Sequence, residues 1–215
     1  MSCRNGVSTA KRCQGRPVPV EIPAVRPGTG RLHFFFHSPD SSLPVRDVLD
    51  KQRRTFKTEP YIEKGAENYC CNCWQPNIRG FVEGGEQFLF LFTTCRRKDD
   101  HKHFGEVYVV GYIKRGRFAC NSDGGWSVIG PTRLYAFKDA FPLAKIRDNT
   151  AQPRQVRRKL EPKEVSLLLK KLGERRSILG KCRSEVKKLK RQLRNLEPDE
   201  WKNQERRAKA CRLYS

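Results

Sequence analysis

Apolar and polar residues alternate most densely between Gly84 and Leu143, where β-branched and aromatic residues are concentrated. The pattern predicts strands at about 86–94, 106–114, 126–130 and 133–138. Phe88, Phe90 and Phe92 are spaced two apart, so they share one face of the first of these strands. Several short strands in this arrangement favour a small, strongly bent sheet or barrel, whose interior the three phenylalanines would fill.

Three weaker patterns precede this region. The apolar run at 32–36 is followed by turn residues and predicts a first strand. Apolar residues with helical spacing predict a short helix within residues 45–56. Residues 69–77 combine three cysteines with Trp74 and end in a turn.

The C-terminal third has a different character after Asn149. Two copies of one helix-start pattern, a proline followed by acidic residues, begin at Pro162 and Pro198. Between them an a/d heptad spans residues 165–196, with one break at Arg175. Its apolar positions are Val165, Leu168, Leu172, Leu179, Cys182, Val186, Leu189, Leu193 and Leu196. The repeat fits either a self-associating hairpin or coiled coil that joins two chains as a homodimer, or an ordinary amphipathic helix of a monomeric tail packed back on the β domain.

These patterns predict the α+β class: a small bent sheet or barrel followed by a basic C-terminal helical hairpin or coiled coil. Residues 1–30 show neither strand nor helix periodicity and are expected to be a disordered basic arm. The barrel domain is expected at 31–148, a linker at 149–160, and the basic helical tail at 161–215.

The net charge of the chain indicates which classes of binding partner it favours. Lys and Arg number 45 against 23 Asp and Glu, so the net charge is +22 at pH 7. Such a charge favours a polyanionic partner, of which nucleic acid is the commonest and an anionic membrane the second. No apolar run approaches the length of a membrane span and no signal peptide is evident, so we expect an intracellular protein without membrane insertion, cytoplasmic or in the nucleoid or nucleus.

The nine cysteines are better explained as reduced thiols than as a disulfide framework. Cys70, Cys71 and Cys73 resemble half of a zinc site, but their spacing lacks the two intervening residues that a zinc knuckle has. A more distant site that uses Cys95, His101 and His103 stays open. Buried thiols in a strand are the favoured interpretation, so no metal or cofactor is predicted.

Clusters of basic residues are the candidate phosphate contacts. One cluster lies in the loop that follows the strand at 86–94, a second follows the strand at 106–114, and a third lies on the polar face of the heptad helix. The candidates are Arg96, Arg97, Lys98, Lys114, Arg115, Arg117, Lys187, Lys188, Lys190 and Arg191. Solvation of ordinary charged surfaces is the alternative for each.

Trp74 is the most informative aromatic residue because it precedes Gln75-Pro76-Asn77, a turn with amide side chains. An indole can stack on a base while the amides bond to its edge. An equally good explanation is that Trp74 covers the open end of the barrel.

A series of features runs from Trp74 to Leu143. They are Trp74, Arg79, Gly85-Glu86 opening the strand Phe88 to Phe92, Val110-Gly111-Tyr112-Ile113, and Phe141-Pro142-Leu143. Their order resembles the PUA-like superfamily, in particular its EVE and YTH-related branch and the prokaryotic modules associated with nucleotide modification. Glu86 replaces the aspartate usual there, and residues 96–104 look like an insertion.

The resemblance implies a compact β-barrel that takes one base into an aromatic-lined pocket. In this chain Trp74 and either Tyr112 or Trp126 would stack on the base. Asn77 and Arg79 would contact its edge or a flanking phosphate.

No catalytic motif is present: the chain lacks a phosphate-binding loop with Lys-Ser or Lys-Thr and a Gly-x-Ser-x-Gly turn. The leading hypothesis is a non-enzymatic protein that binds RNA or DNA. One alternative is a structural component of a ribonucleoprotein or protein assembly. Another is the recognition subunit of a modification-dependent nuclease whose cutting activity lies in a partner.

Overall fold

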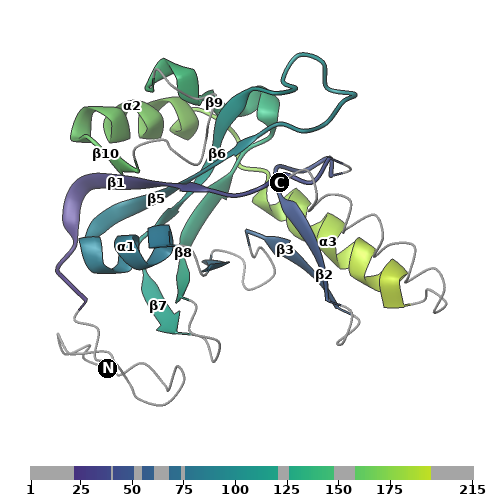
Figure 1. The fold of residues 1–215 in the computed structure, drawn as a ribbon, viewed down its shortest axis with the longest axis horizontal. Helices are drawn as coiled ribbons and strands as arrows, with labels where there is room; N and C mark the ends of the chain where they lie inside the picture. Colours follow the sequence, from purple (N-terminus) through teal and green to yellow (C-terminus); the bar gives the residue numbers. More distant parts are fainter. Residues whose placement is uncertain are drawn as a thin grey trace.

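The computed structural model describes residues 22–39, 41–50, 55–60, 68–73, 76–120, 126–147 and 158–194. They form an α+β protein built on one curled sheet, in agreement with the predicted class (Figure 1). The strands of the sheet are β1 (Arg26–Phe34), β4 (Asn68–Cys73), β5 (Glu86–Thr94), β6 (Val107–Lys114), β7 (Arg117–Cys120), β8 (Trp126–Leu134), β9 (Phe141–Pro142) and β10 (Lys159–Leu160). A separate hairpin consists of β2 (Arg46–Asp50) and β3 (Thr55–Glu59).

The main path through the sheet is β10-β1-β5-β6-β8-β4, with β7 paired to β8 and β9 paired to β6. β1 and β5 are parallel, and the other pairs are antiparallel. The helices are α1 (Pro76–Gly84), α2 (Pro162–Gly173) and α3 (Leu179–Arg194), with short 3-10 turns η1 (Phe137–Asp139) and η2 (Leu143–Lys145).

Helices cover both faces of the sheet, so an apolar core lies on each side. α2 packs on the face that carries Phe88, Phe90 and Phe92, which we call the α2 face. α1 and α3 pack on the opposite face, the α1–α3 face, where Phe81 of α1 joins the core. Figure 1 shows α2 above the strands and α1 below them. The three phenylalanines therefore fill a sheet–helix layer and not the interior of a closed barrel.

The heptad residues are divided between these two cores. Val165 and Leu168 of α2 are buried on the α2 face, whereas Leu179 and Cys182 of α3 are buried on the α1–α3 face. Five residues separate the end of α2 at Gly173 from the start of α3 at Leu179. The seam predicted over 165–196 is therefore not continuous, because α2 and α3 are separate helices and their described apolar positions pack on opposite faces of one sheet.

This packing also corrects the predicted domain boundaries. The segment from 158 to 182 contributes to both cores, so it belongs to the same folded unit as residues 31–148. β1 begins at Arg26, inside the segment expected to be a disordered arm. β10 pairs with β1 inside the predicted linker at 149–160. The homodimer through residues 165–196 stays a prediction, since the side chains of its heptad positions after Cys182 lie outside the described residues.

Two local predictions in the first half of the chain also change. The helix expected within 45–56 is instead the β2–β3 hairpin, with Val48 paired to Lys57 and Leu49 to Phe56. The helical spacing there extended over only five residues. So short a pattern does not outweigh the preference of the neighbouring β-branched and alternating residues for strands. The turn expected at Pro76 is the first turn of α1, in agreement with the preference of proline for that position.

A β-bulge in β6 contributes to the curl of the sheet. Leu91 pairs with Gly111 and Phe92 with Val109, so Val110 is the extra residue. A Cβ at Gly111 would collide with the carbonyl oxygen of Arg133 in β8. The Val-Gly step in the sequence thus has a structural reason, since only glycine lets the two strands approach here.

Candidate nucleic-acid interface

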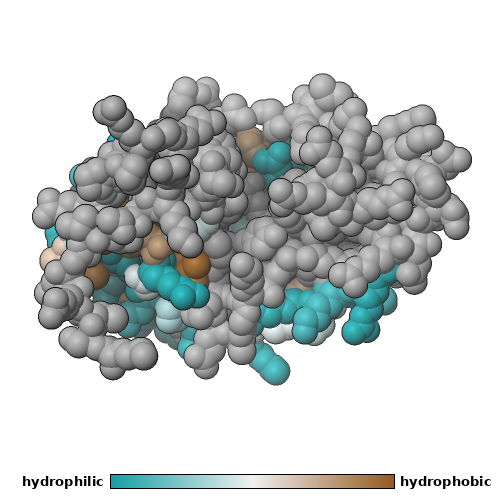
Figure 2. All heavy atoms as spheres, turned by 90° about the horizontal axis from the view of Figure 1, so that it is seen from below, coloured by the Kyte–Doolittle hydropathy of each residue, from teal (hydrophilic) through white to brown (hydrophobic). Residues whose placement is uncertain are grey.

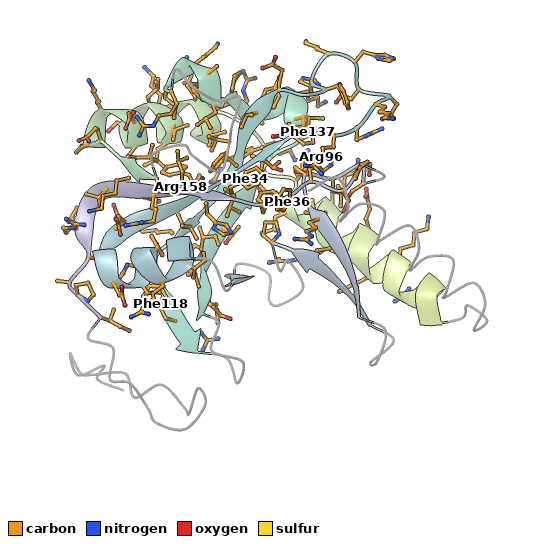
Figure 3. All side chains as sticks on the ribbon, in the orientation of Figure 1. Phe34, Phe36, Arg96, Phe118, Phe137 and Arg158 are labelled. Carbon is orange, nitrogen blue, oxygen red and sulfur yellow. The ribbon has the colours of Figure 1, made fainter. Side chains whose placement is uncertain are left out.

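Two arginines meet on one phenylalanine ring where the parallel strands β1 and β5 end. The guanidinium carbons of Arg46 and Arg96 lie 5.6 Å and 5.3 Å from the centroid of the Phe36 ring. We call these three half-buried residues the arginine–phenylalanine cluster. Both distances are within the range of cation–π attraction, so the ring concentrates positive charge at this end of the sheet. Figure 3 shows Phe36 and Arg96 together at the base of the β5–β6 loop.

Buried His37 holds the two loops that carry these arginines. Its Nδ1 atom accepts the backbone N–H of Arg96 at 3.1 Å. Because an amide can only donate, Nδ1 carries no proton, and Nε2–H donates to the carbonyl oxygens of Ser41 at 3.1 Å and Leu43 at 3.0 Å. One neutral imidazole thus joins the start of the β5–β6 loop to the segment that leads into Arg46.

The environment of His37 keeps it neutral. The pKa of His37 is lowered from 6.5 to about 4, chiefly by burial and also by the charges of Arg97 and Arg96, while the bonds to Ser41 and Leu43 oppose this shift. Protonation would place a hydrogen on Nδ1 against the amide of Arg96. The geometry of the arginine–phenylalanine cluster therefore depends on an uncharged imidazole.

The β5–β6 loop continues the basic surface beyond Arg96. Arg97 forms an ion pair with Asp99, and Lys98 between them is exposed. Lys98 therefore remains a candidate phosphate contact, while the charge of Arg97 is partly matched within the loop.

Arg115, at the other end of β6, has a structural role that the sequence did not predict. Its guanidinium donates to the carbonyl oxygens of Phe81 at 2.8 Å, Val82 at 2.9 Å and Glu86 at 3.3 Å. It lies over the rings of Phe81 and Phe118 at 5.4 Å and 4.7 Å. Since these carbonyls include the last ones of α1, Arg115 caps the helix. Its prediction as a phosphate contact is therefore corrected.

Lys114 and Arg117 flank Arg115 and are exposed. They lie at the opposite end of β6 from Lys98, roughly 20 Å away by the rise of an eight-residue strand. The two predicted basic groups therefore form separate patches on the molecule.

α3 carries the third basic group. Its sequence has one acid, Glu185, and seven basic residues: Lys181, Arg183, Lys187, Lys188, Lys190, Arg191 and Arg194. Lys187, Lys188 and Arg191 are exposed, and the side chain of Lys190 lies outside the described part. Figure 2 shows hydrophilic side chains along the lower right edge of its face, at the horizontal position that α3 occupies in Figure 1.

The five residues of the predicted base pocket do not come together as one site. Tyr112 packs against Phe88 and Phe90 on the α2 face. Arg79 is exposed on α1, which covers the opposite face, and pairs with Glu83 at 2.7 Å. The sheet separates Tyr112 from Arg79, so a pocket containing both is a wrong prediction.

The other three residues of that pocket are described only in part. Trp74 and the side chains of Asn77 and Trp126 lie outside the described residues. The backbone of Trp126 pairs with Cys73 at the end of β4. Asn77 lies in the first turn of α1, which follows β4. The backbone positions of Asn77 and Trp126 thus belong to neighbouring elements.

Two residues of the arginine–phenylalanine cluster, Phe36 and Arg46, were not predicted as site residues. Phe36 was assigned to the first strand with Phe34 and Phe35, and Arg46 to a helix. A signal was present in Phe36-His37-Ser38-Pro39, where an apolar run ends in a turn, so that the last aromatic residue must leave the core.

The side chains of Cys70, Cys71 and Cys73 lie outside the described part of β4, so their burial stays a prediction. Elsewhere in the described residues Cys95 and Cys182 are buried and reduced, and no group of three His, Cys, Asp or Glu side chains is close enough to hold a metal ion. Of the described helices, none is both long and apolar enough to cross a membrane.

Compared with family models, with curated proteins and with solved structures, the chain finds no match.

Proposed function

We propose that this chain is a non-enzymatic nucleic-acid-binding protein that holds backbone phosphates at the arginine–phenylalanine cluster. The observation that carries the proposal is the pair of guanidiniums on Phe36. A guanidinium stays charged at all physiological pH values, and its planar fork of donors matches the oxygens of a phosphate. The ring and the bonds of His37 to both loops fix where these forks lie, so less ordering is needed when a phosphate binds.

The exposed basic residues of α3 supply a second, sequence-independent contribution. Lys187, Lys188 and Arg191 are exposed on a helix whose buried side packs on the sheet through Leu179 and Cys182. A helix held in this way presents its cations as a fixed row. Each phosphate that such a row neutralises releases counterions, which makes the affinity strongly dependent on salt.

A PUA-like relationship is part of the same proposal. The curled sheet and the bulge at Val110-Gly111 support it, as does the backbone pairing of Trp126 with Cys73 beside the start of α1. Base recognition would then involve Trp74, Asn77 and Trp126 at this end of the sheet, without Tyr112. The phosphate contacts proposed above do not depend on it.

The decisive experiment measures binding of labelled single- and double-stranded DNA and RNA by fluorescence anisotropy across a salt series. Arg46→Ala with Arg96→Ala should weaken binding about 10-fold or more near physiological salt and reduce the salt slope by about one to two units. Arg46→Lys with Arg96→Lys keeps both charges and should recover only part of the affinity, because the planar fork is lost.

A control for net charge is Lys163→Ala with Lys170→Ala, which removes two exposed charges from α2. If this control loses as much affinity as the cluster variant, only the overall charge attracts nucleic acid and the cluster is not a site. If wild-type protein binds none of the four nucleic acids, the proposal fails and a structural role in a protein assembly takes its place.

A further inference from the structure

Phe104 lies at the surface although it is large and apolar. Its side chain is 49% exposed, and it is the only aromatic residue among the exposed large apolar residues of the described chain, Val25, Phe104 and Leu167. It lies in the β5–β6 loop between Lys102 and Glu106. An exposed aromatic ring within a basic loop raises the question of what it contacts.

The loop that carries Phe104 has a defined structure. The carbonyl oxygen of Asp100 accepts the backbone N–H of His103 at 3.0 Å and of Phe104 at 2.9 Å. The ring of His103 lies 5.5 Å from that of Tyr108 and 6.5 Å from that of Phe137, and its Nδ1 lies 2.7 Å from the carboxylate of Asp100. His103 therefore faces the protein while the next residue, Phe104, faces solvent.

The end of the loop is closed at Gly105. Its φ of +79° favours glycine, and its N–H donates to the carbonyl oxygen of Cys95 at 2.9 Å. The N–H of Cys95 in turn donates to the carbonyl oxygen of Glu106 at 3.0 Å. Phe104 is thus presented on a closed turn, which limits the conformational entropy lost when a flat partner stacks on its ring.

The loop that carries this ring also carries exposed cations. Asp99 pairs with Arg97 and Asp100 with His103, so two acids of the loop are engaged within it. Lys98 and Lys102 are exposed, and the ion pairs of the described residues do not involve them. The loop therefore offers one aromatic face that two exposed lysines precede in the sequence.

We propose that Phe104 stacks on an unpaired nucleobase while Lys98 and Lys102 contact the adjoining phosphates. Every base has a π-face that an aromatic side chain can cover, but in a duplex the neighbouring bases already cover it. The proposal rests on the nucleic-acid function inferred above and narrows it to single-stranded segments. A membrane surface is less suitable, because one phenylalanine buries little apolar area in a bilayer.

The position of the loop agrees with this assignment. Arg96 of the arginine–phenylalanine cluster begins the segment that leads to Phe104, and Figure 3 shows the loop extending from the region of Arg96. A single strand held by its phosphates at the cluster has its next bases near the loop. Phosphate binding and stacking therefore belong to one continuous surface.

The test uses the full-length protein, an unstructured oligothymidylate of about 15 nucleotides, and a DNA duplex of equal length. Phe104→Ala should weaken single-strand binding about 5- to 100-fold, leave duplex binding within about twofold, and leave the salt slope unchanged. Phe104→Trp should restore single-strand affinity. Leu167→Ala, which truncates the exposed apolar residue of α2, is the matched control and should bind as wild type.

The outcomes separate this inference from the function on which it rests. If wild-type protein binds both nucleic acids and Phe104→Ala is unchanged, the stacking role is overturned while the nucleic-acid function stands. Equal losses for strand and duplex would also overturn it. If Phe104→Ala instead abolishes co-sedimentation with phosphatidylserine vesicles and leaves oligothymidylate binding intact, the loop contacts membranes and the inference fails. If wild-type protein binds neither the oligothymidylate nor the duplex, both the nucleic-acid function and the stacking role of Phe104 are overturned.

Discussion

Arg96 and Arg115 occupy related positions at opposite ends of the β5–β6 pair, and their surroundings give them different roles. Each follows one of the two strands, and each lies over a phenylalanine ring. Arg115 also donates to three backbone carbonyls at the end of α1, and burial lowers its pKa. At the other end the Phe36 ring holds a second cation, Arg46. The acceptors and cations nearby, more than the residue type, decide whether an arginine stabilises the fold or is suited to a ligand.

The largest expected effect is a loss of stability at low pH, because two buried histidines must then be protonated. One of them, His37, holds the loop that carries Arg96. Folded His33 and His37 have pKa values of about 3 and about 4, both lowered chiefly by burial, against 6.5 for an ordinary histidine. The unfolded chain therefore binds more protons below pH 6.5, so the free energy of unfolding is fully present above that value and decreases as the pH falls towards 4. For two histidines the loss should be about 4 kcal/mol between about pH 7 and pH 5, measured by chemical denaturation.

His37→Gln isolates the contribution of the arginine–phenylalanine cluster to this effect. Glutamine keeps a hydrogen-bonding side chain that does not titrate, so about half of the pH dependence should disappear. At about pH 4 and below, where His37 of the folded wild type becomes protonated and the loops around Arg96 lose their common partner, the nucleic-acid affinity of His37→Gln should exceed that of wild type. An unchanged pH profile in His37→Gln would show that this imidazole is not the acid-sensitive element.

Removing the arginine at the other end should have a smaller effect, and on stability alone. Arg115→Ala leaves carbonyls of Phe81 and Val82 without their donor and should cost about 2 to 3 kcal/mol in the free energy of unfolding, with a lower Tm. Arg117→Ala, which truncates an exposed neighbour, should stay within about 0.5 kcal/mol of wild type. If Arg115→Ala weakens nucleic-acid binding at a temperature where it is fully folded, the division of roles between the two arginines is wrong.

The elements with a strong local pattern were predictable from the sequence. β5 spans Glu86–Thr94 and β6 spans Val107–Lys114, within one residue of the prediction, because alternating β-branched and aromatic residues fix both strands. α2 begins at Pro162 with Glu161 and Glu164 forming a capping box, in agreement with the predicted start. Local propensity and tertiary packing agree at these places.

Pairings that depend on distant residues were not predictable. The apolar positions of α2 and α3 fit a heptad, but periodicity within a helix does not specify which partner surface it covers. Gly30 illustrates the missing information: a Cβ there would lie 2.9 Å from side-chain atoms of Phe90 and Val165, so β1, β5 and α2 meet at that point. Nothing near Gly30 in the sequence indicates this contact.

For the candidate site, the sequence predicted the kind of ligand, a phosphate, but not which residues come together to form the site. The charge of the β5–β6 loop indicated phosphate binding at Arg96 and Lys98, whereas its partners Phe36 and Arg46 come from segments about 50 to 60 residues earlier. The parallel pairing of β1 with β5 brings these segments to one end of the sheet. Since parallel strands require a crossover connection, this neighbourhood is set by topology and not by local sequence.

The smallest expected effect concerns the cations of α3. Replacing Lys187, Lys188, Lys190 and Arg191 by alanine should flatten the dependence of log K on log salt by up to about one unit per lost phosphate contact, with little change in the preference for strand over duplex. Anisotropy titrations at several salt concentrations measure both quantities. The alanines also raise helix propensity, so the helix should persist by circular dichroism. An unchanged slope would leave the arginine–phenylalanine cluster and the Phe104 loop as the whole binding surface, because charge alone on an exposed helix would then contribute nothing measurable.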